Sequence, residues 1–168
     1  MPLRRLIFLS SLVLAVAALS PAAASGAANG TDRPLSGTFS ATHIQNLNTQ
    51  TGTIDGTFLF THLGKGTFHE YTTSSTQTGN TFTYTATETY VAANGDKLFA
   101  TVAATGTFTP FQDTTVETIT GGTGRFAGAS GTFTTARVGV IVSVVFVPGV
   151  GVIVTDTFTG TAVGQISY

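Results

Sequence analysis

The residues best suited to chemistry in this chain are acidic side chains that alternate with aromatic ones. Along 81–91, one face of an extended strand carries Phe82, Tyr84, Ala86, Glu88 and Tyr90, and threonines occupy the other face. We expect the aromatic face to point inward, which places Glu88 among aromatic rings. A carboxyl group in apolar surroundings holds its proton more tightly and can act as a general acid or base near neutral pH.

The same alternation in neighbouring segments supplies the other candidates. Phe68 shares a face with Glu70, and Val152, Val154, Asp156 and Phe158 share a face near the C-terminus. The predicted catalytic residues are Glu88, Glu70 and Tyr84, and the predicted ligand-binding residues are Phe58, Phe60, His62, Phe82 and Tyr90. An alternative stays open, since acidic residues at strand ends are often solvated and a one-residue bulge inverts the alternation.

Other kinds of site find less support in the residue spacing. His43, His62 and His69 are not accompanied by a closely spaced ligand pair, so we predict no metal site and no cofactor. No Ser-His-Asp or Cys-His arrangement can be singled out. For Arg125 we expect an ion pair with Asp113 or Glu117 at the rim of the fold.

Alternation with period two runs through the whole chain after the N-terminal segment, and no window has apolar residues at helical spacing. Turn signals such as Asn94-Gly95 and Pro148-Gly149-Val150-Gly151 separate about eight strands. The predicted strands are 36–44, 54–62, 66–75, 81–92, 97–108, 113–120, 131–147 and 152–167. This pattern predicts an all-β fold, an antiparallel barrel of about eight strands, with a β-sandwich as the second choice.

The tripeptide Gly-Thr-Phe recurs at 37–39, 56–58, 66–68, 106–108 and 131–133. We interpret it as glycine at a strand entry or bend, threonine facing outward and phenylalanine facing inward.

A glycine-rich stretch at 119–133, ITGGTGRFAGASGTF, does not fit a nucleotide-binding loop. Gly122, Gly124 and Gly128 are one residue too widely spaced for the dinucleotide fingerprint, and a strand rather than a helix follows them. The stretch resembles the signature of the allene oxide cyclase barrel superfamily, which includes the plant dirigent proteins. The matching residues are Thr120, Gly121, Gly122, Gly124, Phe126, Gly128 and Gly131.

This resemblance covers about residues 92–134 and implies an eight-stranded barrel with an apolar cavity, in which Phe126 plugs the barrel and the glycines allow a tight turn. Members of the superfamily cyclise an unstable lipid epoxide, guide radical coupling or cyclise polyketide intermediates. The signature contains none of their catalytic groups, so the resemblance carries the fold and not an activity.

The N-terminus predicts export. Arg4 and Arg5 precede the apolar run 6–19, and Ala22-Ala23-Ala24 follows as a cleavage pattern. We therefore expect a signal peptide at 1–24, a linker at 25–35, a barrel domain at 36–168, and a protein that is secreted into the medium or periplasm, in our interpretation by a bacterium. Removal of the signal peptide leaves five basic and eight acidic residues, which is no footprint for nucleic acid.

The uncharged segment 138–154, VGVIVSVVFVPGVGVIV, is rich in β-branched residues and contains a Pro-Gly turn. It therefore predicts two strands rather than a membrane span, and since both faces are apolar we suspect a homo-oligomer. These features together predict a secreted β-barrel that binds a small hydrophobic molecule in its lumen. Two alternatives stay open: a cofactor-independent cyclase, isomerase or dirigent-like protein, and a structural, self-associating extracellular protein.

Overall fold

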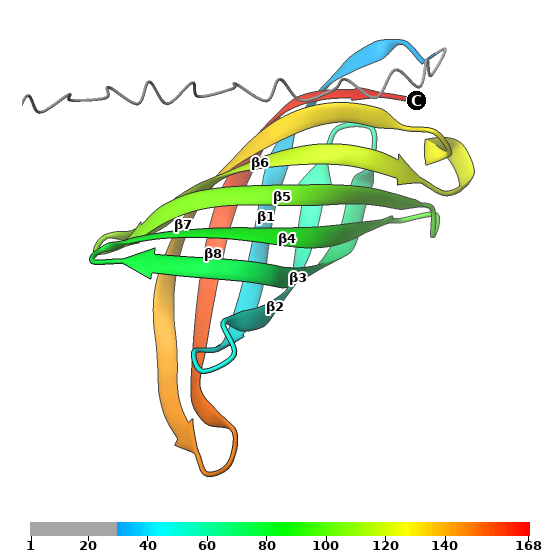
Figure 1. Cartoon of the computed structure of the whole chain (residues 1–168). Coiled ribbons are helices and arrows are strands. Elements are labelled where there is room, and N and C mark those ends of the chain that lie inside the picture. The colour runs from blue at the N-terminus through cyan, green and yellow to red at the C-terminus, as the bar shows by residue number, and fades with distance from the viewer. Residues whose placement is uncertain (1–29) are drawn as a thin grey trace, which may run out of the picture.

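Eight antiparallel strands close into a barrel in the computed structural model, which describes residues 30–168 (Figure 1). Each strand pairs with the next one, and β8 returns to pair with β1. The elements are β1 (Asp32–Asn46), β2 (Thr51–Phe60), β3 (Gly64–Thr78), β4 (Thr81–Ala92), β5 (Lys97–Phe108), β6 (Phe111–Gly122), the short 3₁₀ turn η1 (Gly124–Phe126), β7 (Ser130–Val147) and β8 (Gly151–Ser167).

The predicted all-β barrel is confirmed, and the sandwich alternative is wrong because the sheet has no open side. All eight predicted strands are present. The linker expected at 25–35 is too long, since β1 already begins at Asp32 and pairs there with Ser167. The predicted signal peptide at 1–24 lies outside the described residues.

The Gly-Thr-Phe repeats have a different role from the one expected. Their threonines point outward and their phenylalanines inward, as predicted, but most of the glycines lie within strands. Several inward glycines sit directly opposite a phenylalanine of the next strand, and a Cβ there would lie within 2.6 Å of that residue. These pairs are Gly37–Phe60, Gly56–Phe68, Gly66–Phe58, Gly106–Phe82, Gly160–Phe39 and Gly164–Phe133. The missing side chain makes room for the facing phenylalanine, so a narrow barrel accommodates many inward aromatics.

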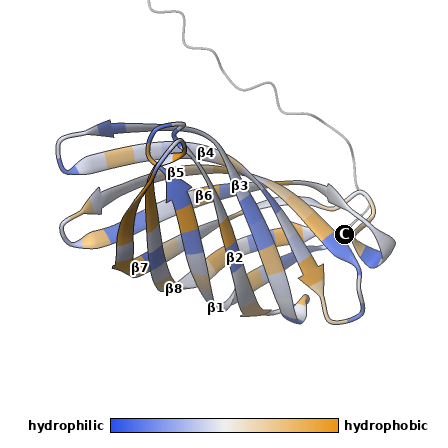
Figure 2. Cartoon of the chain, turned by 90° about the horizontal axis from the view of Figure 1, so that it is seen from below, coloured by the Kyte–Doolittle hydropathy of each residue, from blue (hydrophilic) through white to orange (hydrophobic). Residues whose placement is uncertain are grey.

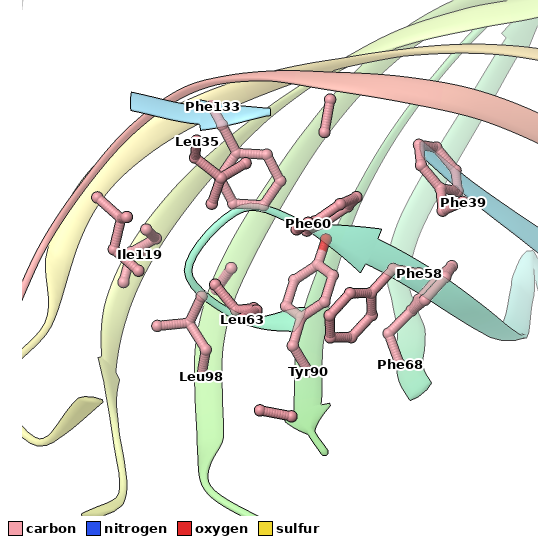
Figure 3. Close-up of a cluster of buried hydrophobic side chains, with 14 of the residues drawn as sticks. Leu35, Phe39, Phe58, Phe60, Leu63, Phe68, Tyr90, Leu98, Ile119 and Phe133 are labelled. Carbon is pink, nitrogen blue, oxygen red and sulfur yellow. The ribbon is translucent and has the colours of Figure 1, made fainter. Parts of the chain in front are cut away.

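One end of the barrel is filled by hydrophobic side chains (Figure 3). Phe58 and Phe60 lie 4.8 Å apart between ring centroids, and Tyr90 packs edge-on against Phe58 at 5.4 Å. The glycine-rich signature turn covers this end. Its Phe126 is fully buried beside the ring of Tyr168, and Gly124, with φ of 56°, leaves no room for a Cβ next to the Asp96 carboxylate. We call this the closed end.

The uncharged segment 138–154 forms the part of the β7–β8 hairpin around its turn at Pro148 to Val150. Between residues 30 and 168, no helix is long and apolar enough to cross a lipid bilayer. The turn of this hairpin lies at the end of the barrel opposite η1, and we call that end the open end.

Replacement of Phe126 by alanine is expected to lower the free energy of unfolding by about 3–5 kcal/mol, because the change empties a fully buried site. Leu59→Ala is the matched control, since Leu59 is 61% exposed on the outer face and should cost less than about 1 kcal/mol. Urea unfolding of both variants measures the difference. Equal losses in the two variants would contradict the assignment of Phe126 as the plug.

Candidate functional site

A cavity of about 310 Å³ opens into the lumen at the open end of the barrel. Apolar side chains from several strands form much of its wall, and polar side chains such as Gln45, Gln50 and Gln77 also line it. The apolar ones include Ile54, Phe82, Phe108, Phe111, Val154 and Phe158. Its floor is polar and consists of His43, Tyr84, Asp113, Arg137 and Asp156. A space with an apolar wall and a few converging polar groups is the usual form of a small-molecule site.

Arg137 on β7 organises the polar floor. Its Nε donates a hydrogen bond of 2.6 Å to Asp113 Oδ1, and its Nη2 donates to the hydroxyl of Tyr84. The Nη1 atom lies 3.6 Å from Glu70 Oε2, and the guanidinium stacks over the ring of Phe158 at 4.7 Å. Arg137 is buried, so its charge is stable there only because these carboxylates surround it.

A second polar pair lies across the floor from β1 to β8. His43 Nδ1 and Asp156 Oδ2 are 3.0 Å apart, and both residues line the cavity. Within the described part of the chain, the buried atoms Asp156 Oδ1 and His43 Nε2 have no hydrogen-bond partner. A buried polar atom without a partner is costly, so a polar ligand group that reaches either atom would gain a hydrogen bond that the fold alone does not supply.

Deeper in the barrel, a layer of carboxyl groups separates the cavity floor from the hydrophobic closed end. Tyr90 donates a hydrogen bond of 2.5 Å to Glu117 Oε2, and Thr115 donates one of 3.1 Å to Glu117 Oε1. Glu88 and Glu70 are direct cross-strand partners on β4 and β3, and both are buried. Three glutamates thus share one apolar interior.

Burial governs the protonation of this interior. It raises the pKa of Glu117 to about 7, an effect that the hydrogen bonds from its neighbours reduce. Burial, together with the charges of Glu117 and Glu70, raises the pKa of Glu88 well above its usual range. Burial also raises the pKa of Glu70, while the charge of Arg137 opposes the shift.

Burial also alters the protonation of Asp113 in the cavity floor. Burial raises its pKa to about 8, and the nearby charges of Glu70, Asp156 and Glu117 act in the same direction. The hydrogen bond from Arg137 Nε acts in the opposite direction, because it favours the ionised form. A carboxyl group poised in this way can exchange a proton with a bound molecule near neutral pH.

The structure divides the predicted site residues into three places. Phe82 and Tyr84 line the cavity. Phe58, Phe60 and Tyr90 belong to the hydrophobic core, and Glu70 and Glu88 lie below the floor without lining the cavity. His62 is in the turn after β2, with φ of 69° and its ring beside Tyr168 at the closed end, because β2 ends at Phe60 rather than at residue 62.

The predicted ion pair of Arg125 with Asp113 or Glu117 is wrong. Its side chain lies 3.9 Å from Asp96 and donates to the carbonyl of Leu63, while Asp113 pairs with Arg137. The alternative that the glutamates are solvated at the barrel mouth is also wrong, since Glu70 and Glu88 are almost fully buried.

The sequence reasoning missed the central residue, Arg137. The signal was present, because Phe133, Thr135 and Arg137 alternate on one face of β7 and all three are buried. An inward arginine is hard to predict from one strand, since the carboxylates that neutralise it come from β3 and β6.

The described residues contain no group of three or more histidine, cysteine or acidic side chains arranged to hold a metal ion. Comparisons of the chain with models of protein families, with curated proteins and with solved structures find no match. The resemblance to the allene oxide cyclase barrel superfamily therefore stays a prediction.

The buried carboxyl groups should make the barrel less stable at alkaline than at mildly acidic pH. A pKa that is raised in the folded state means that the folded protein binds more protons than the unfolded chain. The contribution of Glu117 to the free energy of unfolding is therefore fully present below about pH 4.5 and is lost as the pH rises through about 7. The loss attributable to this group is on the order of 3 kcal/mol, and urea unfolding between about pH 5 and pH 8 measures it.

Glu117→Gln is expected to flatten this pH dependence, because an amide has no proton to lose. Asp55→Asn is the control, since Asp55 is an acidic residue on the outer face whose side chain is 70% exposed. Stability that stays constant or increases from pH 5 to pH 8 in the unaltered protein would contradict the assignment.

Proposed function

We propose that this chain is an exported β-barrel protein that binds a small hydrophobic molecule in the open end of its lumen. The observation that carries the proposal is the cavity of about 310 Å³, with aromatic and aliphatic side chains on its wall and a compact polar group at its floor. The export part rests on the N-terminal pattern of basic, apolar and small residues.

The polar floor supports a definite kind of ligand. The floor and the layer below it hold five carboxyl groups against one arginine, and His43 is already engaged with Asp156. The Asp156 Oδ1 atom accepts no hydrogen bond within the described chain, so a hydroxyl or protonated amine fits this position better than an anion. We therefore infer a mainly apolar ligand with one hydrogen-bond donor at its end.

Binding of a neutral, environment-sensitive dye such as Nile red tests the cavity. Phe82→Ala is expected to weaken binding about tenfold, because it removes an aromatic ring from the cavity wall. Phe146→Ala is the control of the same residue type, since Phe146 is 70% exposed on the hairpin and does not line the cavity. If Phe146→Ala weakens dye binding and Phe82→Ala does not, the site is on the surface and the proposal fails.

Native mass spectrometry of the protein purified from its own secretion medium addresses the natural ligand. We expect a co-purifying small molecule whose mass is lost on Phe82→Ala. An unliganded protein, together with failure of the dye assay, would leave the lumen without a binding role.

A cyclase or isomerase that steers a reactive intermediate is the second candidate. The specific observation in its favour is Asp113, a cavity-lining carboxyl group with a pKa near 8. In this case Asp113 transfers a proton to or from the bound molecule. Arg137 positions Asp113 through a hydrogen bond, and the Tyr84 hydroxyl holds the guanidinium by accepting a hydrogen bond from it. Glu88 and Glu70 then influence the electrostatic surroundings of Arg137 and do not contact the substrate.

Asp113→Asn separates the two candidates once the co-purifying compound is known. An enzyme is expected to lose conversion of that compound while still binding it, whereas a binding protein shows no conversion with either version. Glu88→Gln serves as the comparison, because Glu88 does not line the cavity and its loss should change turnover less than the loss of Asp113.

A further inference from the structure

The β7–β8 hairpin extends beyond its neighbouring strands at the open end (Figure 1). On the β6 side, the last register pair joins Gln112 to Val138, so the residues from Gly139 to Val147 continue past the end of β6. All of these residues except Val142, which lies in a bulge, still pair with β8 on their other side. We call the side of Gly139–Val147 that faces away from β8 the free edge.

The two edges of this hairpin differ. The β8 edge is covered almost to its tip, because β1 pairs with it as far as Ile153 and the loop after β1 continues the contact. The backbone amide of Leu47 donates to the carbonyl of Val152 at 2.9 Å, and the amide of Val152 donates to Asn48 Oδ1 at 3.0 Å. Within the described residues, the ring of Phe111 lies beside Gly139, but no strand, loop or side chain forms a hydrogen bond with the free edge of β7.

The free edge also lacks the usual features that prevent strands from associating. Its sequence, GVIVSVVFV, contains no charge and no proline, and most of its large apolar side chains are exposed, among them Val140, Val142, Val145 and Phe146. In Figure 2, hydrophobic residues follow one another at the ends of β7 and β8. Natural proteins protect exposed edges with charges, prolines or a covering segment, and an edge without them is a template for another strand.

A strand satisfies this edge better than a lipid surface does. Lipid would cover the valines but leave the outward N–H and C=O groups without partners, which is costly in an apolar medium. The chain's own described start is at the closed end, where the carbonyl of Gly30 accepts a hydrogen bond from Ser167. The edge is uncharged on both faces, so an antiparallel copy of itself matches it without burying a charge.

We propose that two copies of this protein associate through the free edges of β7, which pair antiparallel about a two-fold axis and join the two hairpins into one sheet. A bulge between Ile141 and Ser143 leaves residues 143–147 in regular register with β8, and Val145 lies at the centre of this run. We place the two-fold axis at the centre of this regular run, where Val145 meets its own copy in the dimer.

The absence of cysteine from the sequence gives a sharp test. Val145→Cys is expected to form a disulfide-linked dimer on mild oxidation, because the two thiols face each other across the paired edges. Val116→Cys is the matched control, since Val116 lies on the outer face of β6 and both valines are 51% exposed. Equal cross-linking of the two variants would overturn the proposal.

Light scattering after size exclusion supplies the independent measurement. The unaltered full chain is expected to elute as a dimer, and Val145→Lys, which places two like charges together, is expected to raise the dimer dissociation constant tenfold or more. Val116→Lys should leave the dimer intact. A monomeric unaltered protein at every concentration, or a dimer that Val145→Lys does not weaken, would overturn edge pairing.

Discussion

The pairing of β8 with β1 is the interaction on which the rest of this structure depends. It runs from Asp32 opposite Ser167 to Asn46 opposite Ile153, and it closes the sheet into a barrel. In a closed barrel every second side chain is enclosed, whatever its polarity. The closure therefore gives the glycine–phenylalanine pairs their tight packing, and it also forces charged groups such as Glu88 and Arg137 into a common interior.

The inside of the barrel is divided along its axis by polarity. Phenylalanines and aliphatic residues fill the closed end, carboxyl groups and Arg137 form the middle, and the cavity occupies the open end. Carboxyl groups in such a place are stabilised either by a proton or by a positive charge, and the barrel uses both means. Arg137 lies in ion-pair contact with Asp113 and Glu70, while burial favours the protonated form of Glu88.

This buried polar layer costs folding free energy that an all-apolar interior would not. The same groups form the floor of the cavity, where Asp156 and His43 each keep one atom unpaired within the described chain. Residues that are poorly satisfied in the fold alone are those that a ligand can satisfy. The backbone of the β7–β8 hairpin is unsatisfied in the same way. The N–H and C=O groups on the free edge of residues 139–147 have no hydrogen-bond partner within the described residues.

The sequence by itself determined the class of fold and the direction of most side chains. Period-two alternation located all eight strands, Asn94-Gly95 marked a hairpin, and the alternation along 81–91 correctly placed Phe82, Tyr84 and Glu88 inside. These features are local, since the pleat of one strand decides which face each residue occupies.

Only the tertiary structure decided which inward residues meet. Glu88 and Phe60 both point inward, but one lies in the carboxyl layer and the other in the hydrophobic core. Arg137 became central because the strand register brings Asp113 and Glu70 to it from β6 and β3. Depth along the barrel depends on how far neighbouring strands are shifted past one another, and no single strand carries that information.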